Sequence, residues 1–251
     1  MSAAEARRYN PMQPRDPGGK DGGRWVGTGG ASGGTGEWLW GDDEPRFALV
    51  PEVSAPGNLS SEQRGELLKY SRGGYRELNE PLMDGRSLPE NLERRAQVID
   101  SALAEAGDLE KPRTVWRGVN FGGREHGEFI LHLPKAEQER LQYELVADWA
   151  EETWRPGEVY EPRGFQSTSF SPAPALNAAT GRTDPGVIFE IRAKTGVFLD
   201  PEEGLTGFDD EDELLQGRAA RYRVRGVLRE VPFEQEGGET LHRTVVQLEE
   251  I

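Results

Sequence analysis

The spacing of the apolar residues changes near residue 107, from a helical period to strand-like alternation. Upstream of this point, Ser60 and Gln63 form a capping-box pattern, and apolar residues follow it at helical spacing. A second short helix is expected to carry Tyr75, and a longer helix opens at residues 87–89 and ends at Gly107. The chain from residue 59 to residue 107 is therefore predicted to be helical.

Most of the chain beyond residue 107 is predicted to form strands. Residues 114–119 are β-branched and aromatic and are bounded by proline and glycine, which is typical of a strand. Residues 134–154 instead carry apolar side chains along one helical stripe. Further strands are predicted over residues 158–170, 187–192, 197–199, 212–216, 220–231 and 241–249.

Composition separates residues 1–57 from the rest of the chain. This stretch holds paired glycines spaced by Ser, Thr and Pro, and its string GTGGASGGTG matches neither of the phosphate-binding patterns GxxxxGK[ST] and GxGxxG. We predict a flexible arm over residues 1–57 and a single domain over residues 58–251. Trp25, Trp38 and Trp40 could give the arm short docking contacts. Residues 10–25 resemble sequences attached to phage head and minor capsid proteins.

The charge of the chain restricts its partners. The 251 residues carry a formal net charge of -15, which argues against a nucleic-acid duplex or an anionic membrane and suits a cationic protein target. No apolar run approaches membrane-spanning length, and the first residues lack the apolar segment of a secretory signal. We therefore expect no nucleic-acid partner, no membrane partner and no signal peptide.

Metal and thiol chemistry are not indicated. Cysteine is absent, and the three histidines, His126, His132 and His242, lack the spacing of metal ligands. The chain also has no Gly-x-Ser-x-Gly elbow, so its serines do not indicate a serine hydrolase. We expect no metal site.

Residues suited to catalysis or binding occur in three places along the predicted strands. Glu211 and Glu213 are two residues apart, so in an extended backbone both carboxylates reach one site. There they could stabilise a positive charge and transfer a proton. Arg117 is a planar fork suited to a phosphate or a carboxylate, and Gly118 lets a ligand approach the backbone.

The third place is the run Ser167-Thr168-Ser169. Strand alternation puts Ser167 and Ser169 on one face and Thr168 on the other. A hydroxyl beside a carboxylate can hold it in one rotamer, so Ser167 is a candidate partner for Glu213.

Four segments in this order resemble the Arg-Ser-Glu class of mono-ADP-ribosyltransferases, which includes the enzymatic components of clostridial binary toxins. The resemblance covers residues 59–250. The segments are Leu59-Ser60-Ser61-Glu62-Gln63 to Tyr70-Ser71-Arg72-Gly73-Gly74-Tyr75-Arg76-Glu77-Leu78-Asn79; Thr114-Val115-Trp116-Arg117-Gly118; Gly164-Phe165-Gln166-Ser167-Thr168-Ser169; and Glu211-Asp212-Glu213-Leu214-Leu215 followed by Tyr222-Arg223-Val224.

The resemblance implies a fold, a co-substrate and an acceptor. The fold would be the α+β ADP-ribosyltransferase fold, in which two facing, mainly antiparallel β-sheets form an NAD cleft beside N-terminal helices. NAD would be the co-substrate. In this class a glutamate two residues before the catalytic one accompanies an arginine acceptor, so the chain would transfer ADP-ribose to arginine side chains of a target protein.

The resemblance also assigns roles to the catalytic residues. Arg117 would clamp an NAD phosphate, and Ser167 would orient Glu213. The Glu213 carboxylate would hydrogen-bond the nicotinamide ribose and stabilise the oxocarbenium ion as nicotinamide departs. Glu211 would hold the attacking group and help to deprotonate it, and the acidic residues around it would attract a guanidinium.

Further ligand contacts are implied with less detail. Tyr75 and Asn79 match a Tyr-x-x-x-Asn pattern on the helix beside the cofactor. Residues 172–186 would form a flexible loop over the phosphates and nicotinamide, with Arg182 as a phosphate ligand. Phe208 would contact the target protein. The remaining expected NAD contacts are Gly118, Thr168 and Ser169.

Two other functions remain open at this point. Water could replace the acceptor, which would make the chain an NAD glycohydrolase. The chain could also be a structural virion protein with an inherited fold, for which the arm is the working part. The transferase and the virion protein can be combined. An active toxin or effector, attached to a phage head by the arm, would be found in the virion and then in the cytoplasm of the host bacterium. Secretion by a non-classical route is a further possibility.

Overall fold

The computed structural model describes residues 56–119, 135–179, 186–206, 212–234 and 240–251. The predicted arm lies almost wholly outside these ranges. Within them, no helix is both long and apolar enough to cross a membrane.

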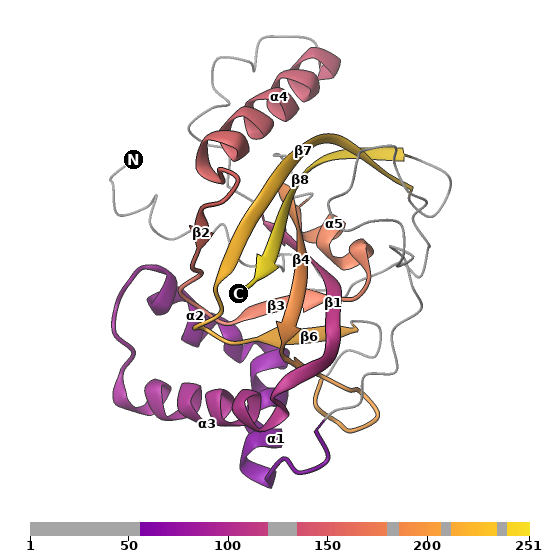
Figure 1. The fold of residues 1–251 in the computed structure, drawn as a ribbon. Helices are drawn as coiled ribbons and strands as arrows, with labels where there is room; N and C mark the ends of the chain where they lie inside the picture. Colours follow the sequence, from indigo (N-terminus) through magenta and orange to yellow (C-terminus); the bar gives the residue numbers. More distant parts are fainter. Residues whose placement is uncertain (1–55, 120–134, 180–185, 207–211, 235–239) are drawn as a thin grey trace.

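Helices α1, α2 and α3 pack together at one end of a large sheet (Figure 1). α1 (Ser61–Lys69) continues through the π-helical turn η2 (Tyr70–Gly74) into α2 (Tyr75–Met83), and α3 spans Glu90–Ala106. The predicted capping box is confirmed, because the Gln63 N–H donates to Ser60 Oγ at 3.2 Å and the Ser60 N–H donates to Gln63 Oε1 at 2.7 Å. Gly107 follows α3 with a φ of 66°, as expected of a residue that ends a helix.

Eight strands of the described chain form one hydrogen-bonded sheet, in the order β2-β7-β8-β4-β1-β3-β6-β5. β4 and β8 are parallel, and the other described pairs are antiparallel. The α+β class and the mainly antiparallel pairing are therefore confirmed. The strands are β1 (Asp108–Val119), β2 (Val159–Tyr160), β3 (Gln166–Ser169), β4 (Val187–Thr195), β5 (Val197–Phe198), β6 (Glu213–Gln216), β7 (Tyr222–Glu234) and β8 (Thr240–Glu250).

The two expected sheets are two parts of this one sheet. In Figure 1, β4, β7 and β8 run at a steep angle to β3 and β6. β1 joins the two parts, since it pairs with β4 along most of its length and with β3 through Trp116 and Ser169.

The strand predicted over residues 158–170 is interrupted and forms β2 and β3 instead. Pro162 lies between them and has no N–H to donate to a ladder. The backbone of Phe165 is also bound elsewhere: its N–H donates to Asn79 Oδ1 and its carbonyl accepts from Asn79 Nδ2, both at 3.0 Å. A continuous strand would have to break these bonds.

The prediction of a loop over residues 172–186 is wrong for its first half. This half forms helix α5 (Pro172–Ala179). Pro172 and Pro174 lie in the first helical turn, where a missing N–H costs nothing, and alanine favours the helix beyond. Ala175, Leu176 and Ala179 pack against the sheet with Trp116 and Ile188. This burial gives the segment a fixed conformation.

Three apolar clusters connect the sheet to its helices. One includes Tyr70, Phe165 and Leu215 and lies between α1–α3 and the β5–β6 end of the sheet. A second is the α5 cluster described above. The third includes Trp154, Phe189 and Leu248, with Trp149 of α4 (Lys135–Thr153) packed against it. The candidate site residues therefore lie on strands that are packed on both sides.

The close approach of α5 to β1 requires a glycine at position 118. A Cβ built on Gly118 would lie 2.0 Å from the Ala175 carbonyl oxygen and 2.7 Å from the Ala179 nitrogen. The neighbouring atoms are backbone and cannot turn away. The structure thus gives Gly118 a packing role, and its contact with NAD stays a prediction.

Replacing Gly118 with alanine is expected to lower the free energy of unfolding by about 1–3 kcal/mol, because the added methyl group overpacks the α5 contact. Urea-induced unfolding measures this change. The matched control is Gly65→Ala, on the exposed side of α1, where a Cβ meets nothing within 4 Å. That variant should be slightly more stable than wild type, by about 0.5–1 kcal/mol, since alanine favours a helix. Equal destabilisation of both variants would contradict the packing role.

Candidate active site

Arg117 lies near the end of β1 with its side chain buried, at 2% exposure. Its Nη1 donates to the Ser167 carbonyl oxygen at 2.8 Å, which ties β1 to β3. Burial lowers the pKa of the Arg117 guanidinium below its usual value, and Tyr160, Tyr70, Tyr222 and Glu213 oppose this shift. A positive charge is therefore held inside the protein among polar neighbours.

The three hydroxyl groups of β3 have different surroundings. The Thr168 hydroxyl donates to the Leu214 carbonyl at 2.8 Å, and the Ser169 hydroxyl accepts from the Ser171 N–H at 3.0 Å. Both therefore help to hold the backbone around the site. The Ser167 side chain instead interacts with the Tyr70 hydroxyl and favours a lower pKa for it. The contacts of Thr168 and Ser169 with NAD stay predictions.

Glu213 begins β6 and is also buried, at 3% exposure. It lies directly opposite Ser169 in the ladder, and Ser167 lies opposite Leu215. Opposite residues of an antiparallel pair share a face, so Ser167 is diagonal to Glu213 on the same side of the sheet. The preceding residue, Asp212, has a φ of 29°, which is unusual outside glycine and turns the chain into the strand.

Tyr70 connects these side chains to the helical layer. Its hydroxyl accepts from Asn79 Nδ2 at 3.1 Å and contacts the Ser167 side chain. Burial and the nearby Glu213 raise the pKa of Tyr70 to about 12, while Ser167, Arg117 and Asn79 oppose the shift. The group is therefore neutral at physiological pH. The sequence assigns Tyr70 no role in the site, because it follows the apolar residues of α1 at helical spacing.

The predicted helix pair Tyr75 and Asn79 lies beside this group. Tyr75 is buried with its ring centroid 6.1 Å from that of Tyr70. The Asn79 side-chain amide donates to the Tyr70 hydroxyl and the Phe165 carbonyl and accepts from the Phe165 N–H. These bonds fix the chain that enters β3. Whether either side chain also touches NAD stays a prediction.

Two further tyrosines stand close to Arg117. Tyr160 of β2 and Tyr222 of β7 stack with ring centroids 6.2 Å apart, and both interact electrostatically with the guanidinium. Burial raises the pKa of Tyr160 to about 12 and that of Tyr222 well above its usual value. The Tyr222 hydroxyl donates to Gln216 Oε1 at 3.0 Å. The only sequence signal for these residues is weak: both are aromatic residues in strands that flank the motifs.

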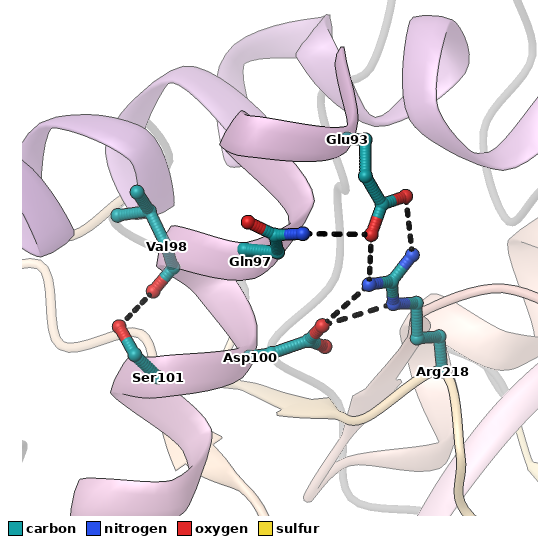
Figure 2. A network of polar contacts seen from close by, with 6 residues as sticks. All are labelled: Glu93, Gln97, Val98, Asp100, Ser101 and Arg218. Atoms are coloured by element: carbon teal, nitrogen blue, oxygen red, sulfur yellow. Dashed lines mark hydrogen bonds and ion pairs between the residues drawn. The ribbon is translucent and has the colours of Figure 1, made fainter. Parts of the chain in front are cut away.

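An ionic network holds the turn after β6 to α3 (Figure 2). Arg218 donates to both carboxylate oxygens of Glu93, at 3.1 and 2.8 Å, and to Asp100 Oδ2 at 3.0 Å. Its guanidinium also lies over the Phe165 ring, 5.9 Å from the centroid. Phe165 in turn packs edge-on against Tyr70, with centroids 5.8 Å apart. The strand of Glu213 and the entry to β3 are thus held against the same helical layer.

The described structure brings Arg117, Ser167, Glu213 and Tyr70 together. Arg182, Phe208 and Glu211 lie outside the described residues, as do two of the histidines, His126 and His132. Within the described ranges, no cluster of three or more His, Cys, Asp or Glu side chains could hold a metal ion. The gathered groups offer one cation, one carboxylate and neutral hydroxyls, which suit a reaction that develops positive charge beside a bound anion.

Solved structures of similar fold include an ADP-ribosyltransferase toxin and bacterial exoenzymes. Plx2a, an ADP-ribosyltransferase toxin from Paenibacillus larvae, is 22% identical with a TM-score of 0.53, and the match covers 77% of this chain and 87% of that one. Exoenzyme S from Pseudomonas aeruginosa, solved with human 14-3-3 protein beta and carba-NAD, is 21% identical with a TM-score of 0.51, over 78% and 76% of the two chains.

A third similar structure, C3stau2 from S. aureus with NAD, is 16% identical with a TM-score of 0.52, over 78% of this chain and 89% of that chain. These matches establish the ADP-ribosyltransferase fold. The model of the ADP-ribosyltransferase exoenzyme family matches residues 51–248, so the chain belongs to this family of transferases. No curated protein matches the chain.

The raised pKa values of the buried tyrosines indicate the pH above which the fold loses stability. The pKa values of Tyr70 and Tyr160 are raised from 10.0 to about 12 by burial, so their neutral forms stabilise the fold fully below pH 10 and lose this effect as the pH rises toward 12. Of the six tyrosines, Tyr70, Tyr160 and Tyr222 should ionise only as the protein unfolds. Tyrosinate absorbance and near-ultraviolet circular dichroism, followed together, test this. Complete ionisation with an intact near-ultraviolet spectrum would show the prediction to be wrong.

Proposed function

We propose that the chain is an NAD-dependent mono-ADP-ribosyltransferase that modifies arginine side chains of a target protein and acts as a toxin or effector. The observation that carries this proposal is the gathering of Arg117, Ser167 and Glu213 around the neutral hydroxyl of Tyr70. Family membership supports the transferase activity, and the similar structures of C3stau2 and exoenzyme S were solved with NAD and carba-NAD, respectively.

The charges of the site suit NAD. Arg117 supplies a buried cation for a phosphate, and its fork is held in one orientation by the Ser167 carbonyl. Glu213 supplies the carboxylate that would face the ribose and stabilise the positive charge that develops as nicotinamide leaves. Ser167 and Tyr70 would keep that carboxylate in place, because the Ser167 hydroxyl contacts Tyr70 on the side of the sheet that carries Glu213. Burial of these groups strengthens each interaction.

The acceptor preference rests on charge and on sequence. Glu211 stands two residues before Glu213 and would hold a guanidinium while accepting its proton. The net charge of -15 favours an approaching cationic side chain. Among similar structures, the ADP-ribosyltransferase Vis was solved in complex with agmatine, which carries a guanidinium group; its TM-score is 0.50 and its identity 17%.

An assay with NAD and agmatine tests this function. The wild-type chain is expected to release nicotinamide and to form ADP-ribosyl-agmatine, both quantified by mass spectrometry. Glu213→Gln should lower the rate by about 10²- to 10³-fold, because the charge that stabilises the transition state is lost. Glu161→Gln is the matched control: this carboxylate is exposed and pairs with Arg221 on the surface, so the rate should not change.

The outcomes separate the alternatives. Nicotinamide release without modified agmatine, repeated with labelled NAD and a bacterial lysate, would favour the NAD glycohydrolase. Labelled lysate peptides carrying the group on a side chain other than arginine would reject the acceptor assignment. A chain that neither cleaves NAD nor labels protein would return the structural virion protein as the better hypothesis.

We also propose that residues 1–57 form an arm that attaches the enzyme to a phage head for delivery with the genome. Residues 10–25 resemble phage head-associated sequences, and the family match begins only at residue 51. Purified particles of a phage that encodes the chain should contain it, as measured by mass spectrometry of the virion proteins. Its absence from such particles would contradict the arm's role.

A further inference from the structure

A buried carboxylate, that of Glu250, lies at the end of β8. It accepts hydrogen bonds from the N–H groups of Lys194 and Thr195, at 2.6 and 3.0 Å, and from the Thr195 hydroxyl. Its Oε2 also accepts from Gln216 Nε2 at 3.0 Å. A buried carboxylate needs such donors because they replace its hydration. The nitrogen of the Gln216 amide must therefore face Glu250.

The orientation of the Gln216 amide determines what the Tyr222 hydroxyl can do. Gln216 Nε2 also lies 3.4 Å from the Thr195 carbonyl, a second acceptor that holds the nitrogen on the same side. The amide oxygen, Oε1, accepts from the Tyr222 hydroxyl at 3.0 Å. A phenol has one proton to donate. The Tyr222 oxygen can therefore offer only its lone pairs to its other neighbours.

Arg117 is one of these neighbours. It lies opposite Phe189 in the ladder of β1 and β4, and the Tyr160 ring packs against Phe189 with centroids 5.6 Å apart. Tyr160 in turn stacks with Tyr222, and Tyr222 interacts electrostatically with the Arg117 guanidinium. Carboxylate, amide, phenol and guanidinium thus form a buried polar series, in which each hydrogen bond polarises the next group in the same sense.

We propose that Gln216 is a positioning residue for the binding of NAD. It turns the Tyr222 hydroxyl so that the oxygen faces Arg117, and this oxygen helps to hold the guanidinium in the orientation that binds an NAD phosphate. Gln216 acts through Tyr222, and Tyr222 acts through Arg117. The inference rests on the proposed function, in which Arg117 is the phosphate ligand.

The other partners of Arg117 limit the expected effect. Its Nη1 donates to the Ser167 carbonyl, and Tyr70, Tyr160 and Glu213 also favour the charged guanidinium. Loss of the Tyr222 oxygen should therefore loosen the guanidinium and leave it in the site. A phosphate contact is made in the ground state and in the transition state alike. Its weakening should therefore raise KM for NAD and leave kcat nearly unchanged.

The experiment measures how the full chain binds ligands with and without phosphate. Tyr222→Phe keeps the stacked ring and removes the hydroxyl. Isothermal titration calorimetry with carba-NAD should give a dissociation constant about three- to tenfold above that of wild type, as expected for the loss of one polar contact. KM for NAD should rise by a similar factor, while kcat stays within about twofold. Free nicotinamide has no phosphate, so its inhibition constant should not change.

Three further variants separate positioning from general damage. Gln216→Met removes the amide at a similar side-chain length and should also weaken the binding of carba-NAD. The double variant Gln216→Met/Tyr222→Phe should bind it no more weakly than the weaker single variant, because residue 216 acts only through the Tyr222 hydroxyl. Tyr143→Phe is the matched control. Its hydroxyl accepts from Arg243 Nη1 at 2.7 Å on α4, so its loss should leave the affinity for carba-NAD unchanged.

The results distinguish the inference from the function beneath it. If the wild-type chain releases no nicotinamide from NAD, the proposed function fails, and the inference fails with it. If the wild-type chain cleaves NAD, only the inference is overturned by a Tyr222→Phe variant that binds carba-NAD as tightly as wild type or more tightly, or that loses affinity for nicotinamide by the same factor. Additive losses in the double variant would also overturn it. Thermal unfolding confirms that each variant is folded; if Gln216→Met is not, the two affinities of Tyr222→Phe decide.

Discussion

The burial of one positive charge, on Arg117, determines how the site is built. β1 pairs with β3 through Trp116 and Ser169, and the hydrogen bond from Arg117 to the Ser167 carbonyl reinforces this short junction. A buried guanidinium is tolerated only where polar groups replace its hydration. Here the replacement comes from the Ser167 carbonyl, three tyrosines and Glu213. The groups that stabilise the buried charge are thus the groups that form the candidate active site. The same residues therefore contribute to folding stability and to the proposed chemistry.

The helical layer completes the site because of a local irregularity in it. Between α1 and α2 the chain makes a π-helical turn, in which Gly73 has a φ of 118° that a residue with a side chain would rarely adopt. The turn directs two consecutive buried side chains toward the sheet region: Tyr70 reaches Ser167, and Ser71 reaches Thr206. A regular helix would rotate neighbouring side chains away from each other by about 100°. The irregular turn therefore lets one short segment contact both Ser167 and Thr206.

Local patterns made much of the fold predictable, and contacts between distant residues account for the rest. The capping box at Ser60 and the glycine after α3 depend on a few neighbouring residues, so both were predictable. Arg117, Ser167 and Glu213 stood out because each lies in a short motif. Tyr70 lies in a longer motif without a role of its own, because its polar role arises from the distant Ser167 and from Asn79. Helix α5 was misread although its signals were local: two early prolines and an alanine run suit a helix start as well as a loop.

The sequence does not predict that β1 joins the two parts of the sheet, because the pairing of β1 with β3 and β4 leaves no periodic signal in any one strand. Two parts of the structure differ in tolerance to change. The candidate site is formed by buried groups on packed strands, where a substitution disturbs Arg117 and its partners together. The stretch that ends at residue 206 is instead anchored by Leu205 and Thr206 but exposes Glu203. Surface residues of this stretch can vary without unfolding the core, whereas its anchors cannot. The buried groups around Arg117 therefore tolerate fewer substitutions than the surface of this stretch does.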